Sequence, residues 1–141
     1  MDEKISNKLH TTEPVSLAEK TVLVAEDERV CRTLIKGILD KHGILCLEAE
    51  NGQEALQLLS KHHCDLILTD MRMPIMNGLE LIKTVRQLKT TANNRPIPIM
   101  LVTSEDADTV DEAIKLGVDD YLAKPVSVEM LVPKLRQLLV G

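Results

Sequence analysis

Short blocks of apolar residues alternate along the chain with segments whose apolar residues recur every three or four positions. The blocks have the length of β-strands and lie at residues 21–27, 44–50, 64–70, 97–104 and 120–125. The segments with helical spacing follow them in turn, at residues 29–43, 51–63, 79–88, 108–117 and 128–140. Such spacing is typical of a helix with one buried face. The pattern therefore predicts five strand–helix units in succession.

Three of the helical segments carry a clear start signal. Asn51 with Glu54, and Asn77 with Glu80, have the three-residue spacing of a capping box, in which two free backbone N–H groups of the first turn are satisfied. Ser127 precedes the last helical segment, where a serine side chain accepts a hydrogen bond from the first turn. These signals place the beginnings of three helices.

The first and last helical segments raise more specific expectations. In the first, Val30, Leu34, Ile38 and Leu39 follow helical spacing and are expected to face the core. In the last, Pro133 lies inside the helical pattern, where proline lacks the N–H that a helix interior needs. We therefore expect that helix to kink or to begin later.

The predicted strands are almost continuously apolar, as is typical of strands buried on both faces. Such strands belong to parallel sheets that are covered by helices on both sides. The predicted fold is therefore α/β, a doubly wound five-stranded parallel sheet. Residues 21–141 are expected to form this domain, and residues 1–20 a flexible N-terminal tail or linker. Residues 90–96 are expected to be a polar loop.

Composition and charge narrow the function classes. The chain has 141 residues and a formal net charge of −5, so it lacks the basic surface that a nucleic-acid-binding protein needs, and direct nucleic-acid binding is not expected. No apolar segment is long enough to cross a membrane, so a cytoplasmic location without membrane contact is expected. Tyr121 is the single aromatic residue, so the core must be aliphatic.

The cysteines do not indicate a metal or disulfide framework. There are three of them, Cys31, Cys46 and Cys64, without a CxxC pair, which favours reduced thiols that pack as small apolar residues. The run His-His-Cys at residues 62–64 is a weak zinc signal, because adjacent residues point in different directions and no second ligand pair is evident.

Polar side chains lie at the carboxyl ends of four of the predicted strands. Glu26 and Asp27 end the first strand, Asp70 the third, Thr103 the fourth and Lys124 the fifth. Ligands of open α/β sheets bind at the carboxyl ends of the strands, so these side chains are expected to share one crevice. At each position the alternative is a chain that simply emerges into solvent, and Glu26 or Asp27 could instead cap the next helix.

Clustered carboxylates need a proton or a cation. Two of them about 4 Å apart repel by about 4 kcal/mol at an effective dielectric constant of about 20. Carboxylate oxygens suit Mg²⁺, which also binds phosphate oxygens. A lysine and a hydroxyl beside them suit a phosphoryl group, and an aspartate can accept such a group as a nucleophile. The residues therefore predict phosphoryl chemistry on an aspartate with a divalent metal.

Four motifs in order resemble the receiver domain of two-component response regulators, and in particular the single-domain chemotaxis regulator. They are VAEDE, LILTDMRMPIMNG, IMLVTS and GVDDYLAKP, and the resemblance spans residues 21–140. It implies a flavodoxin-like (βα)₅ fold with strand order 2-1-3-4-5. In that order the first and third strands are neighbours, which agrees with a shared crevice.

The resemblance also implies the roles of the acidic residues. Asp70 is implied to be the phosphoacceptor, which receives a phosphoryl group from a phosphohistidine on a histidine kinase or a histidine phosphotransfer protein. Glu26, Asp27, Asp70 and the backbone carbonyl of Arg72 are the implied Mg²⁺ ligands. The family implies a regulatory domain, with self-phosphorylation and autodephosphorylation only, rather than a conventional enzyme.

Four further residues are implied to transmit the signal. Lys124 resembles the lysine that pairs with the phosphoryl group, and the Lys124–Pro125 bond is commonly cis in the family. Thr103 resembles the hydroxyl that moves to bond the phosphoryl group, and Tyr121 the ring that then turns inward. The face formed by the fourth helix, fifth strand and fifth helix is expected to act on a downstream protein target, an attached domain or a second copy in a phosphorylation-dependent dimer.

The chain departs from the family pattern at a few positions. Glu26 stands where aspartate is more frequent, Ser104 where alanine or glycine is usual, and Val126 where an aromatic residue is frequent. Ser104 is expected to change water access and therefore the dephosphorylation rate. The loop at residues 89–96 is long and resembles receivers attached to hybrid sensor kinases, so that architecture is one alternative.

Other function classes lack their motifs. A phosphatase of the haloacid dehalogenase type needs D-x-D-x-[TV] after the first strand, and a P-loop NTPase needs GxxxxGK[ST]; both are absent. The glycine- and hydroxyl-rich phosphate loop of a flavodoxin is also missing. A receiver-like docking module that works without phosphorylation is the remaining alternative, and it usually loses an acidic residue or the lysine that this chain keeps.

Overall fold

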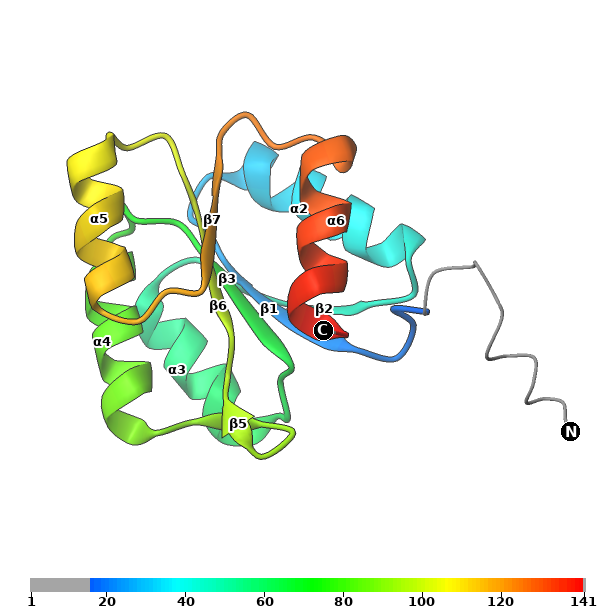
Figure 1. Cartoon of the computed structure of the whole chain (residues 1–141), viewed down its shortest axis with the longest axis horizontal. Helices are drawn as coiled ribbons and strands as arrows, with labels where there is room; N and C mark the ends of the chain where they lie inside the picture. The colour runs from blue at the N-terminus through cyan, green and yellow to red at the C-terminus, as the bar shows by residue number, and fades with distance from the viewer. Residues whose placement is uncertain (1–15, 141) are drawn as a thin grey trace, which may run out of the picture.

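Five parallel strands form the central sheet of the computed structural model, which describes residues 16–140 (Figure 1). The strand order is β2-β1-β3-β6-β7, which confirms the predicted topology. The strands are β1 (Thr21–Ala25), β2 (Leu45–Ala49), β3 (Leu66–Thr69), β6 (Ile99–Thr103) and β7 (Asp120–Ala123). The helices are α2 (Arg29–Lys41), α3 (Gly52–Lys61), α4 (Gly78–Leu88), α5 (Ala107–Lys115) and α6 (Val128–Leu139).

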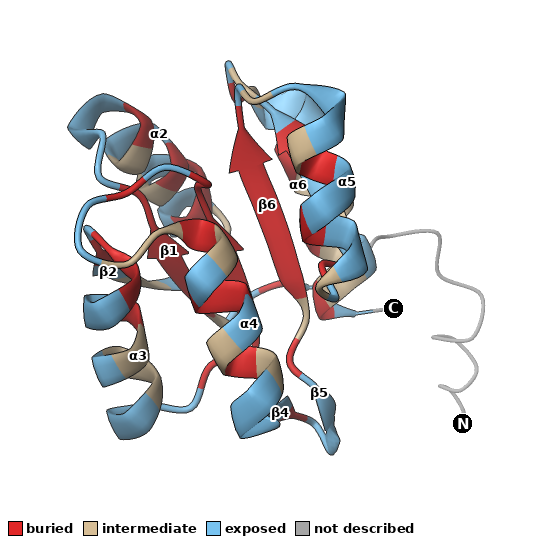
Figure 2. Cartoon of the chain, turned by 90° about the vertical axis from the view of Figure 1, so that its left-hand side faces the viewer, coloured by how far each residue is buried: buried red, intermediate tan, exposed pale blue. Residues whose placement is uncertain are grey.

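The helices cover both faces of the sheet. On one face α2 and α6 share a core with Val22 and Val24 of β1, and on the other α3, α4 and α5 share a core with Leu23 and Ala25. Because successive side chains of a strand point to opposite faces, a continuously apolar strand supplies both cores. Figure 2 shows the outcome in β6, whose residues are all buried, whereas the helices are buried along one side only.

The first helix turns a different face to the core from the one predicted. Val30 and Leu34 are exposed, while the buried residues of α2 are Cys31, Ile35, Ile38 and Leu39. Cys31, Ile35 and Ile38 lie four and three residues apart, so they form a continuous stripe that leaves Val30 and Leu34 at its edge. The prediction was wrong for those two residues and right for Ile38 and Leu39, because the buried stripe takes Cys31 and Ile35 in place of their apolar neighbours.

The predicted caps are present, with one difference. Asn77 and Glu80 form a complete capping box at the start of α4, and Ser127 accepts a hydrogen bond from Met130 N at 3.3 Å. Asn51 accepts from Glu54 N as expected, but the Glu54 carboxylate accepts from Glu50 N instead of from the cap residue.

The last helix does not begin later than its predicted start. The helix begins at Val128 and continues through Pro133 to Leu139. Pro133 lies on the exposed side of α6, where its ring faces solvent. Buried Leu131 and Leu135 on the other side hold the helix against the sheet, so packing outweighs the lost hydrogen bond.

The predicted polar loop after α4 contains a small hairpin. Strands β4 (Thr91–Ala92) and β5 (Arg95–Pro96) pair antiparallel, and the turn residues Asn93 and Asn94 have φ angles of 55° and 64°. Two positive φ angles are the mark of a tight hairpin turn, and asparagine tolerates them better than most residues. The polar loop therefore has a regular turn at its tip, which the sequence analysis did not predict.

The described residues begin shortly before the predicted domain boundary. Residues 1–15 of the predicted tail lie outside the described residues. Leu17 is buried in the core beside α2 and α6, and Glu19 N donates to Gly43 O at 3.1 Å. Between residues 16 and 140, no helix has both the length and the apolar character needed to cross a membrane.

Candidate functional site

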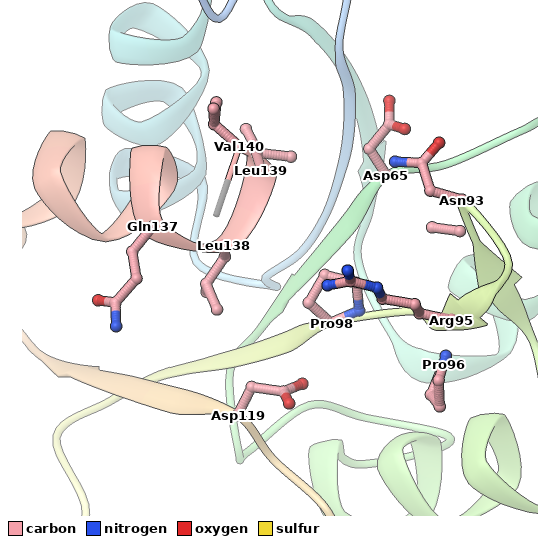
Figure 3. Close-up of a pocket in the computed structure, with 11 residues that line it drawn as sticks. Asp65, Asn93, Arg95, Pro96, Pro98, Asp119, Gln137, Leu138, Leu139 and Val140 are labelled. Atoms are coloured by element: carbon pink, nitrogen blue, oxygen red, sulfur yellow. The ribbon is translucent and has the colours of Figure 1, made fainter. Parts of the chain in front are cut away.

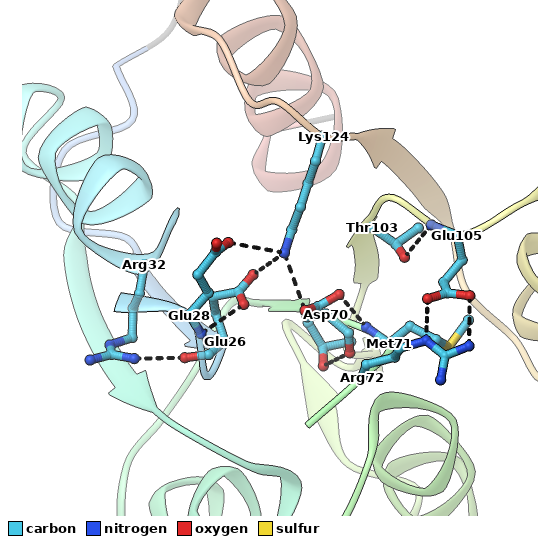
Figure 4. Close-up of polar contacts among 10 residues, drawn as sticks. Glu26, Glu28, Arg32, Asp70, Met71, Arg72, Thr103, Glu105 and Lys124 are labelled. Atoms are coloured by element: carbon cyan, nitrogen blue, oxygen red, sulfur yellow. Dashed lines mark hydrogen bonds and ion pairs between the residues drawn. The ribbon is translucent and has the colours of Figure 1, made fainter. Parts of the chain in front are cut away.

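The carboxyl ends of four strands bring the predicted polar residues together (Figure 4). Ala25 of β1 and Thr69 of β3 are register partners, so Glu26 and Asp70 leave adjacent strands side by side. Asp70 N donates to Ala25 O at 2.9 Å and fixes this arrangement. The strand order reverses between β1 and β3, which is where ligands of open α/β sheets bind.

Three carboxylates gather in the crevice. One carboxylate oxygen from each of Glu26, Asp27 and Asp70 lies within 4.8 Å of the others, the only group of this kind among residues 16–140. Glu26 and Asp70 are 1% and 8% exposed, whereas Asp27 is open to solvent. Asp70 Oδ1 also accepts a hydrogen bond from Met71 N at 2.7 Å, which orients the carboxylate.

Lys124 supplies a positive charge between the carboxylates. Its Nζ lies 2.8 Å from Glu26 Oε1, 3.2 Å from Asp70 Oδ2 and 3.9 Å from Glu28 Oε1. Burial lowers the pKa of Lys124, but the hydrogen bonds and charges of Glu26 and Asp70 outweigh it and raise the pKa above its ordinary value. Lys124 is therefore a permanent cation in the crevice at neutral pH.

Burial disfavours the charged form of Glu26. Burial raises its pKa above 4.5, and the charge of Asp70 adds to the rise, while Lys124 and the hydrogen bond from Glu28 N lower it. Its Oε1 atom is buried and makes no hydrogen bond of standard geometry, although Lys124 Nζ lies nearby. A buried carboxylate oxygen with spare acceptor capacity is available to a cation.

The donor set fits a divalent metal ion. Three carboxylates face a single lysine, so the crevice retains excess negative charge even with Lys124 in place. Carboxylate oxygens are the ligands that Mg²⁺ prefers, and it usually takes one or two of them together with waters and phosphate oxygens. The residues of the crevice are therefore compatible with Mg²⁺.

A close backbone approach fixes the loop after Asp70. A Cβ atom on Gly78, the first residue of α4, would lie 2.1 Å from Asp70 O and 2.9 Å from Met71 Cα. Gly78 N donates to Met71 O at 2.9 Å, and Thr69 Oγ1 donates to Asp70 O at 2.9 Å. Only glycine fits this contact, which ties the start of α4 to the residue at the centre of the crevice.

The remaining predicted residues lie around this group. Thr103, at the end of β6, is buried, and its hydroxyl accepts from Glu105 N at 3.0 Å. Tyr121 lies in the edge strand β7 with 45% of its surface exposed. The Lys124–Pro125 bond is cis.

The sequence patterns missed two residues that shape the crevice. Arg32 Nη1 donates to Glu26 O at 2.8 Å, and Arg32 Nε donates to Glu48 Oε1 at 3.2 Å. Glu105 forms an ion pair with the Arg72 side chain. Neither residue ends a strand or belongs to a motif that contains Asp70, so no simple sequence pattern would have found it.

Another hollow lies at the amino ends of the strands, at the opposite end of the sheet from the crevice (Figure 3). It measures about 400 Å³ and is bordered by Asp65 and Asp119, which precede β3 and β7, and by the end of α6. Asp65 Oδ2 accepts from Thr21 N at 2.8 Å and Asp119 Oδ2 from Ile99 N at 2.8 Å. These carboxylates satisfy the beginnings of strands, so this hollow shares no chemistry with the crevice.

Comparison with known sequences gives a family. The sequence profile of the response regulator receiver domain matches residues 22–136. The chain is 40% identical over 121 residues to a chemotaxis protein CheY homolog of Campylobacter jejuni, covering 84% of this chain and 91% of that protein. It is 36% identical over 121 residues to the phosphate regulon transcriptional regulatory protein PhoB of Pseudomonas aeruginosa, covering 85% of this chain but only 52% of that protein.

Solved structures agree with the sequence comparison. The chemotaxis response regulator CheY4 of Vibrio cholerae has a TM-score of 0.78 at 30% identity, covering 86% of this chain and 100% of that one. The receiver domain of the Pseudomonas aeruginosa sensor histidine kinase PA1611, solved with magnesium in its active-site cleft, has a TM-score of 0.77 at 26% identity, covering 88% and 100%. By fold, crevice and sequence, the chain belongs to the response regulator receiver domain family.

Proposed function

We propose that this receiver domain is a phosphoryl-accepting switch of a two-component phosphorelay, with Asp70 as the acceptor. The observation that carries the proposal is the position of Asp70 at the end of β3. It is buried beside Glu26, within reach of Asp27, and 3.2 Å from the Lys124 ammonium. An aspartate between a metal-binding pair and a fixed cation is equipped to take up a phosphoryl group.

The transfer itself needs little covalent chemistry from the protein. A carboxylate oxygen of Asp70 attacks the phosphorus of a phosphohistidine, the P–N bond breaks, and the imidazole leaves and takes up a proton. Lys124 Nζ lies beside Asp70 Oδ2 and offsets negative charge on the transferred oxygens. Mg²⁺, held by Glu26, Asp27, Asp70 and the backbone carbonyl of Arg72, would supply further charge stabilisation.

The donor is a histidine kinase or a histidine phosphotransfer protein. Support comes from a similar structure, the receiver domain of Ssk1 from Saccharomyces cerevisiae, solved together with the histidine phosphotransfer signalling protein Ypd1. That receiver has a TM-score of 0.78 at 27% identity, with 86% of this chain and 90% of the other covered. The magnesium in the PA1611 receiver supports the choice of metal.

The output is a change in the surface formed by α5, β7 and α6. A phosphoryl group adds a charge of about −1.5 to −2 and three strong acceptors. Thr103 exchanges its bond with Glu105 N for one to the phosphoryl group, and Tyr121 turns inward behind it. Ile114, Tyr121 and Met130 are exposed apolar residues of these three elements and are suited to a downstream protein, an attached domain or a second copy.

A docking module that works without phosphorylation is not favoured. Receiver domains are regulatory proteins, and a chain used only for docking has no need of a complete crevice. Here all four residues of the crevice are kept. Glu26, Asp27 and Asp70 form one carboxylate cluster, and Lys124 pairs with Glu26 and Asp70.

Mass spectrometry tests the proposal directly. The protein is incubated with acetyl phosphate and Mg²⁺, and the intact mass is measured. We expect one phosphoryl adduct, which is absent when a chelator removes Mg²⁺ and absent in Asp70→Asn. Asp40→Asn, which alters an exposed ion pair on α2, is the matched control and should be phosphorylated as the wild type is. An adduct that persists in Asp70→Asn contradicts the assignment.

A further inference from the structure

An ion pair joins two loops at the mouth of the crevice. Arg72 lies in the loop between β3 and α4, and Glu105 lies in the loop between β6 and α5. Arg72 Nη2 donates to Glu105 Oε1 at 3.1 Å, and Arg72 Nε donates to the other carboxylate oxygen, so the contact has two prongs (Figure 4). A paired contact of this kind fixes the direction of the guanidinium group.

The two loops are separated by a hollow at this place, and the ion pair spans it. A hollow of about 280 Å³ lies between them, bordered by Arg72, Glu105, Met73, Leu79 and Thr109. The side chains therefore leave a gap where a well-packed core would fill the space. The Arg72–Glu105 contact is the direct link across that gap.

The same glutamate also holds the predicted switch hydroxyl. Glu105 N donates to Thr103 Oγ1 at 3.0 Å, while the Glu105 side chain holds Arg72. The position of the loop therefore determines both contacts. A movement that takes Glu105 away from Arg72 also weakens the hold on Thr103.

We propose that the Arg72–Glu105 ion pair is a latch that stabilises the unphosphorylated state, an inference that rests on the proposed function. Arg72 follows Asp70 by two residues, in the loop that leaves the crevice. The guanidinium fork matches phosphate as well as carboxylate. When a phosphoryl group sits on Asp70, Arg72 leaves Glu105 for the phosphoryl oxygens, and the Glu105 loop releases Thr103.

A calorimetric cycle with a phosphoryl mimic tests the latch. Binding of beryllofluoride in saturating Mg²⁺ is measured for wild type, Glu105→Gln, Arg72→Gln and the double variant. Glu105→Gln should bind about two- to fivefold more tightly, the range expected for one exposed ion pair. Arg72→Gln alone should change the beryllofluoride affinity little, because it removes both the latch, which opposes binding, and the new contact, which favours it. It should weaken binding in the Glu105→Gln background.

Two further measurements separate the latch from a general structural effect. Affinity for Mg²⁺ alone is measured for all four proteins, so that a change in metal binding is separated from a change in beryllofluoride binding, and Asp40→Asn should match the wild type throughout. In the metal-free protein, amide hydrogen exchange at Glu105 should be faster in Arg72→Gln, because the loop has lost its link. Unchanged exchange contradicts the latch without reference to any ligand.

The outcomes distinguish the two proposals. If the wild type binds no beryllofluoride in the presence of Mg²⁺, the proposed function is wrong, and the role of the latch is lost with it. If the wild type binds but Glu105→Gln binds equally or more weakly, the latch alone is wrong.

Discussion

The buried carboxylate of Glu26 serves the chemistry of the crevice at a cost to the stability of the protein. Its carboxylate is buried beside Asp70, and Lys124 offsets only part of the resulting cost. Removing one partner of a buried ion pair is usually destabilising because the other charge is left unpaired, but Lys124 keeps Asp70 as a partner when Glu26 is neutral. The raised pKa of Glu26 indicates that folding disfavours its charged form relative to its neutral form.

We therefore expect Glu26→Gln to stabilise the metal-free protein at neutral pH. A carboxyl group whose pKa is raised on folding contributes its full stability below the unfolded pKa and loses it as the pH rises through the folded value. The gain should be small below about pH 4.5, grow at higher pH, and reach about 0.5–2 kcal/mol. Urea unfolding of both proteins between pH 4 and 8 measures it.

Added Mg²⁺ should reverse that order. A ligand that binds only the folded state at about a hundred times its dissociation constant adds about 2.7 kcal/mol. The wild type should gain this stabilisation, and Glu26→Gln should gain much less because it has lost a carboxylate ligand. Equal gains in the two proteins would remove Glu26 from the metal site.

The grouping of the central site residues was predictable, but their surroundings were not. Glu26, Asp70 and Lys124 each follow a strand and Thr103 ends one, and parallel strands align their carboxyl ends. The contacts of Glu105 depend instead on the path of a loop and the direction of one long side chain. Neither property is encoded in a local pattern of the sequence.

At the scale of elements, the start of α4 is the most tightly constrained junction. The capping box of Asn77 and Glu80 fixes the first turn, and Gly78 places that turn against the Asp70 carbonyl. Any side chain at Gly78 must push the helix away from the loop that carries Asp70. The position of a whole helix therefore depends on one missing methyl group.

Gly78→Ala should destabilise the protein by about 1–3 kcal/mol or more, because a Cβ atom 2.1 Å from Asp70 O forces the backbone to shift. Gly37→Ala is the matched control. Gly37 is exposed in the middle of α2 with nothing within 4 Å of its added Cβ, so that change should stabilise by about 0.5–1 kcal/mol. Urea denaturation measures both, and a Gly78→Ala protein as stable as the wild type would contradict the close contact.

The order and number of the main elements followed from apolar periodicity, whereas finer features did not. The central strands β1, β3 and β6 were visible because they are apolar on both faces, as in a covered parallel sheet, and the edge strands β2 and β7 show as shorter apolar blocks. The hairpin at Asn93 and Asn94 has strands too short to show a period. Part of the buried face of α2 was misjudged because its stripe takes Cys31 and Ile35 in place of their apolar neighbours.

At the scale of the whole molecule, the site and the expected output surface share strands β6 and β7. Thr103 and Ala123 are register partners, so a movement at the end of β6 acts directly on the strand that carries Tyr121 and Lys124. Strand β7 is the edge of the sheet, and α5 and α6 flank it. A change at Asp70 therefore has a short route to an exposed surface.

We expect beryllofluoride with Mg²⁺ to convert the wild type from monomer to dimer through this surface. Tyr121→Ala should bind beryllofluoride about as well and remain monomeric, because the crevice is intact but the ring that turns inward behind Thr103 is gone. Sedimentation velocity over a range of protein concentrations measures the association state. A Tyr121→Ala protein that dimerises like the wild type would show that the ring does not carry the signal.

Tyr121 also makes the domain its own optical probe. The chain contains no tryptophan and no phenylalanine, so its near-ultraviolet absorption and emission come from this one phenol ring. The ring lies half exposed on the edge strand, where a turn toward the interior replaces water with aliphatic neighbours. Its emission can therefore follow the domain in real time without a label, and every spectral change reports on a single known position.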